Sequence, residues 1–137
     1  MKARGDIFNE ARYKQVVSFV GLEFERKITP TDFDLVLDFD GKEIVIGEFK
    51  LFGNKLPYGQ RLCITNTLEA LFRSGVKTLG LIACHNVPPK ERIIAATTIV
   101  YEIWFDPNKG WIPEHKGRTV RTVIDDWRKY KIGRAHV

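Results

Sequence analysis

The sequence predicts an α/β protein with a central mixed β-sheet flanked by helices. Residues 33–39 and 43–51 are mainly apolar segments on either side of Asp40-Gly41, a dipeptide typical of a β-hairpin turn. A helical pattern over 59–74 then leads to a near-continuous apolar run over 76–84, which is typical of a fully buried strand. Because a hairpin is followed by a helix and a buried strand, we expect a crossover onto a parallel neighbour.

The region before the hairpin predicts one helix and one strand. The helix is expected over residues 6–20, with Asp6 as its N-cap and apolar residues at helical spacing. Glu10 falls on the inward stripe of this helix, although an acid favoured by the helix dipole in the first turns explains it almost as well. Residues 22–28 alternate apolar and polar side chains and predict a half-buried strand at or near an edge.

The hairpin and the segments after it complete the sheet. Both hairpin strands carry apolar residues on both faces, so we expect the hairpin to lie centrally. β-branched and aromatic residues over 98–105, followed by a turn and a short strand over 111–115, predict a C-terminal β-hairpin. A terminal helix is expected over 118–131, so that residues 1–131 form a single domain.

Composition limits the partners and the location. The 137-residue chain has a formal net charge of +5 and a pI near 9.3. A basic balance favours a polyanionic partner, most often nucleic acid. The sequence has no apolar run long enough to span a membrane and no apolar signal-peptide core, so we expect a cytoplasmic protein. Cys63 and Cys84 lie in apolar segments and predict buried, reduced thiols.

The last six residues, 132–137, read Ile-Gly-Arg-Ala-His-Val. They resemble the read-through translation of a sequencing-library adapter. We therefore expect a non-native tail with no function, and whether the natural chain extends past residue 131 stays open.

Two acids and a lysine of the hairpin form the most informative cluster. Asp34 opens the first strand, and Glu48 and Lys50 lie near the end of the second. Side chains alternate between faces with a period of two, so the three share one face only if the connecting loop has an odd length. A three-residue loop of Asp40-Gly41-Lys42 would pair Asp34 with Glu48. Charged groups on a buried sheet are costly to fold, which favours a functional site over a chance cluster.

These residue types suit a divalent metal. Mg²⁺ and Mn²⁺ prefer oxygen ligands, which Asp34 and Glu48 would supply as carboxylates and Phe49 as a main-chain carbonyl. Such an ion polarises a phosphodiester and lowers the pKa of bound water. Lys50 could position that water or stabilise developing negative charge.

The arrangement resembles the PD-(D/E)xK nuclease superfamily over roughly residues 5–85. The matching residues are the segment Pro30 to Asp34, the triplet Glu48-Phe-Lys50, the helix acid Glu10, and Gln60 after the hairpin. The segment from Glu48 through the following helix looks most like the virus-type replication-repair (VRR-Nuc) branch, and the spacing of the acids is also similar to archaeal Holliday-junction resolvases. Phe33 stands where the family often has proline, and Asp32 is an alternative ligand of the same parity.

The resemblance implies a restriction-endonuclease-like core and phosphodiester hydrolysis dependent on Mg²⁺ or Mn²⁺. In that core Glu10 would assist metal binding and Gln60 would support the site. Junction or flap DNA would be the substrate of a microbial or phage-encoded enzyme, and a homodimer would suit paired cuts. Residues 86–131 would form a C-terminal extension.

Several alternatives stay open. The acids and the lysine could form a structural ion-pair cluster, Gln60 could cap its helix, and the chain could bind nucleic acid without cleaving it. RNA is not excluded as the substrate, because the core site does not read the sugar. Lys55 and Arg61 flank the proposed site and are candidate phosphate contacts. The basic residues of the terminal helix fit a solvated face and a phosphate-binding face equally well.

Overall fold

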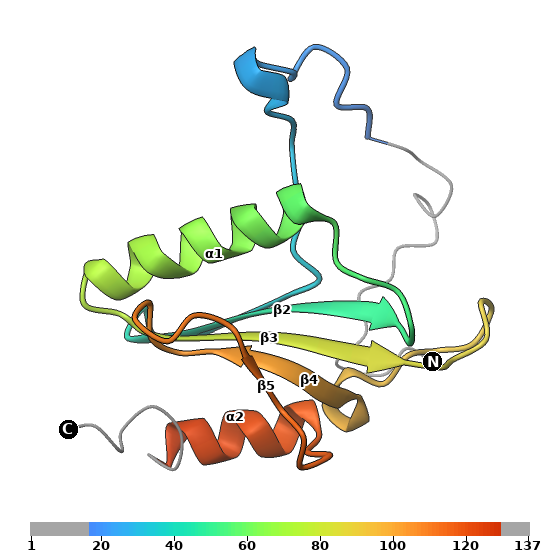
Figure 1. The fold of residues 1–137 in the computed structure, drawn as a ribbon, viewed down its shortest axis with the longest axis vertical. Coiled ribbons are helices and arrows are strands. Elements are labelled where there is room, and N and C mark those ends of the chain that lie inside the picture. Colours follow the sequence, from blue (N-terminus) through green and yellow to red (C-terminus); the bar gives the residue numbers. More distant parts are fainter. Residues whose placement is uncertain (1–16, 130–137) are drawn as a thin grey trace. The chain divides into compact units, whose positions relative to one another are not determined.

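The computed structural model describes residues 17–129, and the chain divides into two compact units, Met1–Pro30 and Thr31–Val137. The second unit is α/β, with a five-stranded mixed sheet in the order β1-β2-β3-β4-β5. Helix α1 covers one face of the sheet and helix α2 the other (Figure 1). The expected central mixed sheet flanked by helices is therefore present.

The first unit differs from the sequence prediction. Residues 17–20, the described end of the expected helix, are not helical, and its other residues lie outside the described range. The strand expected over residues 22–28 is wrong. A 3₁₀ turn, η2 (Glu25–Lys27), stands there instead, closed by a single bridge between Phe24 and Ile28. Arg26 and Lys27 have φ near +60°, a left-handed conformation that an extended strand cannot contain.

The second unit begins with the predicted hairpin. Strands β1 (Leu35–Phe39) and β2 (Glu43–Leu51) pair antiparallel, with Phe39 opposite Glu43. The intervening three-residue turn has the predicted odd length. Asp40 and Gly41 take φ values of 59° and 70°, which suits this dipeptide to a tight reversal.

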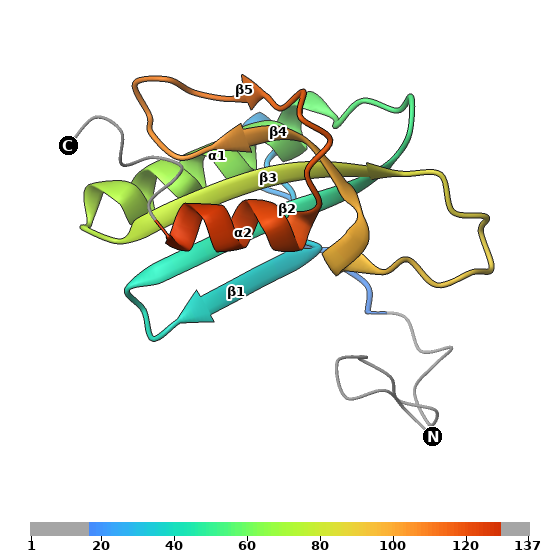
Figure 2. The same cartoon turned by 90° about the horizontal axis from the view of Figure 1, so that it is seen from below.

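The central position expected for this hairpin is wrong for one of its strands. β1 is the first strand in the sheet order, and only β2 is internal (Figure 2). The burial of β1 alternates between half-buried and exposed, and Val36 is 55% exposed. Apolar residues on both faces of β1 therefore did not indicate burial on both faces.

Helix α1 (Tyr58–Arg73) connects β2 to β3 (Lys77–His85), which runs parallel to β2. The helix packs closely on the sheet because β3 carries a glycine under it. A Cβ atom at Gly80 would lie 2.5 Å from Leu68 Cδ1, closer than packed atoms can approach. This close approach brings the helix face that carries Gln60 down to the sheet.

The C-terminal part extends the same sheet. Strand β4 (Ile99–Trp104) follows a short turn, η3 (Ala95–Thr97), and pairs antiparallel with β3 and with the two-residue strand β5 (Ile112–Pro113). Helix α2 (Val120–Arg128) begins at Thr119, whose side chain accepts a hydrogen bond from Thr122 N. The expected hairpin and terminal helix are thus present, as parts of the main sheet and its cover.

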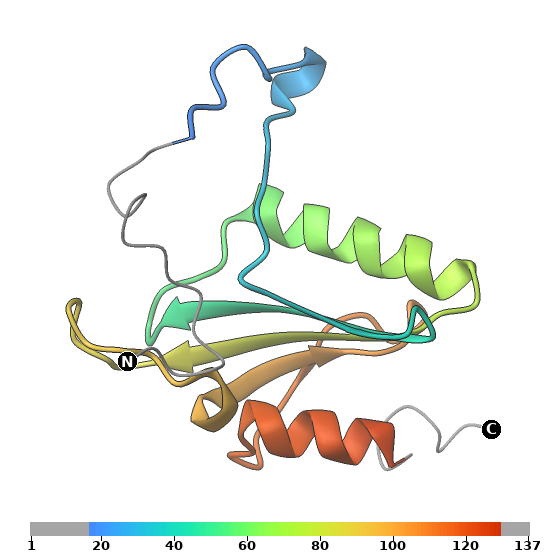
Figure 3. The same cartoon turned by 180° about the vertical axis from the view of Figure 1, so that it is seen from behind.

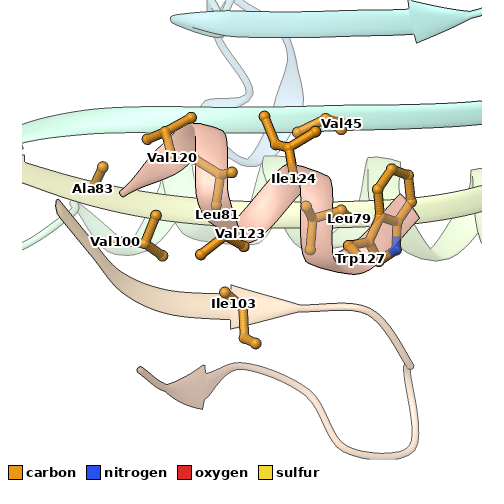
Figure 4. Close-up of a cluster of buried hydrophobic side chains, with 10 residues drawn as sticks. All are labelled: Val45, Leu79, Leu81, Ala83, Val100, Ile103, Val120, Val123, Ile124 and Trp127. Atoms are coloured by element: carbon orange, nitrogen blue, oxygen red, sulfur yellow. The ribbon is translucent and has the colours of Figure 1, made fainter. Parts of the chain in front are cut away.

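Each helix covers a separate apolar cluster on its own face of the sheet. The cluster under α2 joins β2, β3 and β4 to one face of the helix (Figure 4) and contains Val45, Leu79, Leu81, Ala83, Val100, Ile103, Val120, Val123, Ile124 and Trp127. The cluster under α1, on the opposite face (Figure 3), contains Ile46, Leu56, Ile64, Leu68, Ile82 and Trp104. No helix within residues 17–129 is long and apolar enough to cross a membrane.

Candidate metal centre

A buried glutamate lies at the middle of the candidate site. Alternation along β2 directs Ile46, Glu48 and Lys50 to the face covered by α1. Ile46 belongs to the apolar cluster under that helix, whereas Glu48 is a carboxylic acid with only 1% of its surface exposed. A buried carboxyl group requires hydrogen-bond partners or a counter-charge, so its neighbours decide its role.

The first neighbour is Asp34, just before β1. Leu35 pairs with Gly47, so extending the register by one residue sets Asp34 opposite Glu48. The Oδ2 atom of Asp34 accepts a hydrogen bond of 2.9 Å from Phe49 N. Asp34 is exposed and Glu48 is buried, so one acid of the pair is open to solvent and the other lies inside the protein.

The second neighbour is Gln60, in the first turn of α1. Its Nε2 atom donates to Glu48 Oε1 at 3.1 Å, and its Oε1 atom accepts from Lys50 Nζ at 3.2 Å. Only this orientation of the amide satisfies both partners, because a carboxylate accepts and an ammonium donates. Gln60 thus joins the acid and the lysine, and its predicted inward orientation is confirmed.

The described neighbours of Glu48 do not fully stabilise its charged carboxylate. Its Oε2 atom is buried and has no hydrogen-bond partner among the described residues. Burial first, and then the neighbouring Asp34 carboxyl group, raise the pKa of Glu48 to about 8, although Lys50 opposes the shift. The charged form therefore lacks stabilisation that a cation beside the two acids would supply.

These residues fit a hard divalent cation. Glu48 Oε2, which has no hydrogen-bond partner within residues 17–129, and the exposed Asp34 could offer two carboxylate ligands on the same side of the hairpin. The N–H and C=O groups of one strand residue point to the same side, so the Phe49 carbonyl faces β1, where its N–H meets Asp34. Within residues 17–129 no group of three His, Cys, Asp or Glu residues is arranged to hold a metal ion. Glu10 lies outside the described residues, and Asp32 is exposed.

The candidate phosphate contacts lie beside this centre. Lys55 is exposed in the loop between β2 and α1. Arg61 follows Gln60 and makes a two-pronged ion pair with Glu102 on β4, at 3.2 and 2.8 Å. Its guanidinium also lies 5.4 Å from the centre of the Trp111 ring. Arg61 is therefore held rigidly, with its charge partly balanced by Glu102.

Three basic residues of the terminal segment have acidic partners. Arg118 contacts Glu114 and Asp126, Arg121 pairs with Asp125, and Arg128 pairs with Glu43. These contacts favour the structural interpretation of the basic helix over a phosphate-binding one.

Sequence reasoning missed the contribution of β4 to this region. Glu102 and Arg61 are 41 positions apart, so no local pattern relates them. The available signal was Glu102 itself, an acid inside a segment that is otherwise apolar and β-branched.

Comparisons with protein-family models, with curated proteins and with solved structures found no match for this chain.

Proposed function

We propose that this protein is a divalent-metal-dependent nuclease that hydrolyses phosphodiester bonds in DNA. One observation carries the proposal: Glu48 is fully buried, has an oxygen without a hydrogen-bond partner in the described part of the chain, and has Asp34 beside it. A carboxyl group in this state is destabilised unless it is protonated or meets a cation. The resemblance of Asp34, Glu48, Lys50 and Gln60 to the PD-(D/E)xK pattern supports the same conclusion, and so does the odd hairpin loop.

Asp34, Glu48 and the Phe49 carbonyl would hold Mg²⁺ or Mn²⁺. Such an ion, when bound, polarises the phosphodiester and lowers the pKa of a bound water. Lys50 Nζ, held by Gln60, supplies a fixed positive charge for the developing charge on the phosphate oxygens. Gln60 orients both Lys50 and Glu48, so its role is that of a positioning residue.

The basic net charge of the chain supports a polyanionic substrate. We propose that the substrate is DNA and that junction or flap structures are its preferred form. We also propose that the α/β unit is a core of the restriction-endonuclease type. The protein would act in microbial or phage replication and repair.

Incubation with plasmid, junction and flap DNA tests the proposal. The wild type should cut with Mn²⁺ or Mg²⁺ and not with EDTA, and Glu48→Ala and Lys50→Ala should not cut. Glu69→Gln is a matched control, because Glu69 is an α1 acid whose only described ion pair is a long surface contact with Arg73. Cleavage that persists in both site variants would identify a contaminant. Binding without cleavage by the wild type would indicate a nucleic-acid-binding module, and an RNA substrate assayed in parallel decides between the two nucleic acids.

A further inference from the structure

Two hollows lie next to the candidate centre, at the ends of β2 and β3. The larger has a volume of about 620 Å³, and its wall includes Phe52, Lys55, Arg61, Cys84, Tyr101 and Glu102. The smaller, of about 450 Å³, shares Phe52, Cys84 and Tyr101 with it. Both volumes fall within the roughly 300–1,000 Å³ typical of ligand pockets.

An aromatic pair belongs to the walls of both hollows. The Phe52 and Tyr101 rings meet edge to face, with their centres 5.7 Å apart. Both are large apolar side chains left open, with exposed fractions of 56% and 40%. Phe52 N donates to His85 O at 2.7 Å, so the backbone that carries this ring is tied to β3. The rings are thus exposed apolar faces on a fixed support.

The larger hollow also adjoins the proposed catalytic residues. Cys84 in its wall is the β3 partner of Lys50, and Arg61 directly follows Gln60 in α1. Its charged wall residues are Lys55, Arg61 and Glu102, which give an excess of positive charge. Aromatic faces combined with cations are the usual means of binding unpaired nucleotides, because every base has a π-face and every linkage a phosphate.

We propose that the larger hollow binds an unpaired nucleotide next to the scissile phosphate. Its base stacks on one ring of the edge-to-face Phe52–Tyr101 pair and contacts the other ring, and its phosphate contacts Lys55. This inference rests on the proposed function and specifies its substrate: a nucleic acid with a single-stranded segment beside the cut.

The test measures binding separately from cleavage. Fluorescein-labelled oligothymidine, oligouridine and a blunt DNA hairpin are titrated with the protein in EDTA, and anisotropy is recorded. Phe52→Leu and Tyr101→Leu keep an apolar side chain but remove the π-face, so single-strand binding should weaken about 5- to 100-fold. Tyr101→Phe keeps the face and should bind like the wild type. The control is Phe72→Leu, another exposed ring, which meets Trp104 and lines neither hollow.

Cleavage assays with Mn²⁺ complete the test. The two leucine variants should lose cutting of DNA with a single-stranded overhang more than cutting of a blunt duplex. Unchanged single-strand binding in both variants, or no single-strand binding by the wild type, would overturn the inference. If ring-dependent binding occurs but the wild type cuts nothing, the nuclease proposal fails while the nucleotide site stands. Tighter binding of oligouridine than of oligothymidine would identify RNA as the source of the nucleotide.

Discussion

Two buried glutamates, one in strand β2 and one just after β5, have opposite surroundings. Glu114 follows β5 and accepts hydrogen bonds from Lys116 N and from Arg118 Nε, each at 3.0 Å, with a further contact to Arg118 Nη2. Although burial acts the other way, these donors and the Arg118 charge lower the pKa of Glu114. Glu48 is more deeply buried, accepts a hydrogen bond from Gln60, and has its pKa raised to about 8 by burial and by the neighbouring Asp34.

The difference separates an acid with a structural role from the acid that we propose to be functional. The hydrogen-bond donors and the Arg118 charge around Glu114 outweigh its burial and stabilise the charged form within the protein itself. The Glu48 environment adds a second carboxylate, Asp34, where a counter-charge would be expected. Burial alone therefore does not mark a site, and our proposal for Glu48 rests on its burial together with the second carboxylate beside it.

The largest expected effect is on cleavage. Glu48→Gln should lower the rate at least about 100-fold, because the loss of a metal ligand removes several kcal/mol of transition-state stabilisation. Glu114→Gln should cut at the wild-type rate at a temperature where it remains folded. Initial rates on a labelled junction with Mn²⁺ measure both. Equal losses in the two variants would remove the distinction between the two acids.

The second effect is on stability, with opposite signs for the two acids. At pH 8.5 without metal, Glu114→Gln should lower the free energy of unfolding by about 2–3 kcal/mol, because Arg118 loses charge-assisted hydrogen bonds. Glu48→Gln should raise it, since a neutral amide replaces an acid that is costly to ionise there. Urea unfolding followed by tryptophan fluorescence measures both values. A destabilised Glu48→Gln protein would contradict our account of the site.

The third effect is a pH dependence that belongs to Glu48. Its pKa is higher in the folded than in the unfolded chain, so the folded state binds more protons. The associated stability is complete below pH 4.5 and is lost as the pH rises through about 8. The expected loss in the free energy of unfolding is on the order of 2 kcal/mol. It is this small because Asp34 is open to solvent, which screens the interaction that raises the pKa of Glu48. Urea titrations in EDTA from pH 5 to 9 should show the decline in the wild type and not in Glu48→Gln.

Glu114 should dominate when the same titration is extended below pH 4.5. Its pKa is lowered on folding, so its stabilisation is present above the ordinary value of 4.5 and is lost as the pH falls through the folded-state pKa. Glu114→Gln should flatten the acid limb and leave the decline toward pH 9 unchanged. An unaltered acid limb would mean that its ion pair contributes little.

The fourth effect is the response to metal. Mn²⁺ at about 100 times its dissociation constant should stabilise the wild type by about 2.7 kcal/mol. Affinity should rise with pH up to about 8, because the proton on Glu48 competes with the ion. Thermal unfolding with and without Mn²⁺ measures this shift. Glu114→Gln should retain it, and a full response in Glu48→Gln would show that the ion binds elsewhere.

The smallest effect concerns the bridge between Glu48 and Lys50. Gln60→Leu removes both hydrogen bonds and should lower the cleavage rate or the metal affinity about 10-fold. Thr67→Val is the control on the same helix, since the Thr67 hydroxyl donates only to Cys63 O one turn earlier. A Gln60→Leu protein with wild-type kinetics would reduce Gln60 to a packing residue.

Much of the second unit followed from local patterns. The hairpin, α1 and β3 have strong periodicity, and the parity of the turn set the register that brings Asp34 to Glu48. The failures have physical causes. Alternation over 22–28 could not reveal the left-handed backbone at Arg26 and Lys27, and apolar residues in β1 could not reveal that it lies at an edge.

Features that depend on distant pairing were not predictable from local patterns. The contact between Phe52 and Tyr101 and the ion pair between Arg61 and Glu102 each join the start of α1 or its preceding loop to β4. Their partners are set by the register of β4 on β3, which shifts by a bulge between Ile82 and Ala83. Such a bulge leaves no clear mark in the sequence.

The Gln60 bridge also links the charge of the centre to the motion of α1. Gln60 lies in the first turn of the helix, and no side chain among residues 17–129 caps that end. When Glu48 is neutral, its hydrogen bond from Gln60 weakens, and the first turn loses a tether to the sheet. Amide hydrogen exchange in this turn should therefore slow when Glu48 becomes charged beside a cation, while the far end of the helix, seated at Gly80, exchanges at a constant rate. The exchange rate in the first turn of α1 would then indicate whether a cation is bound beside Glu48.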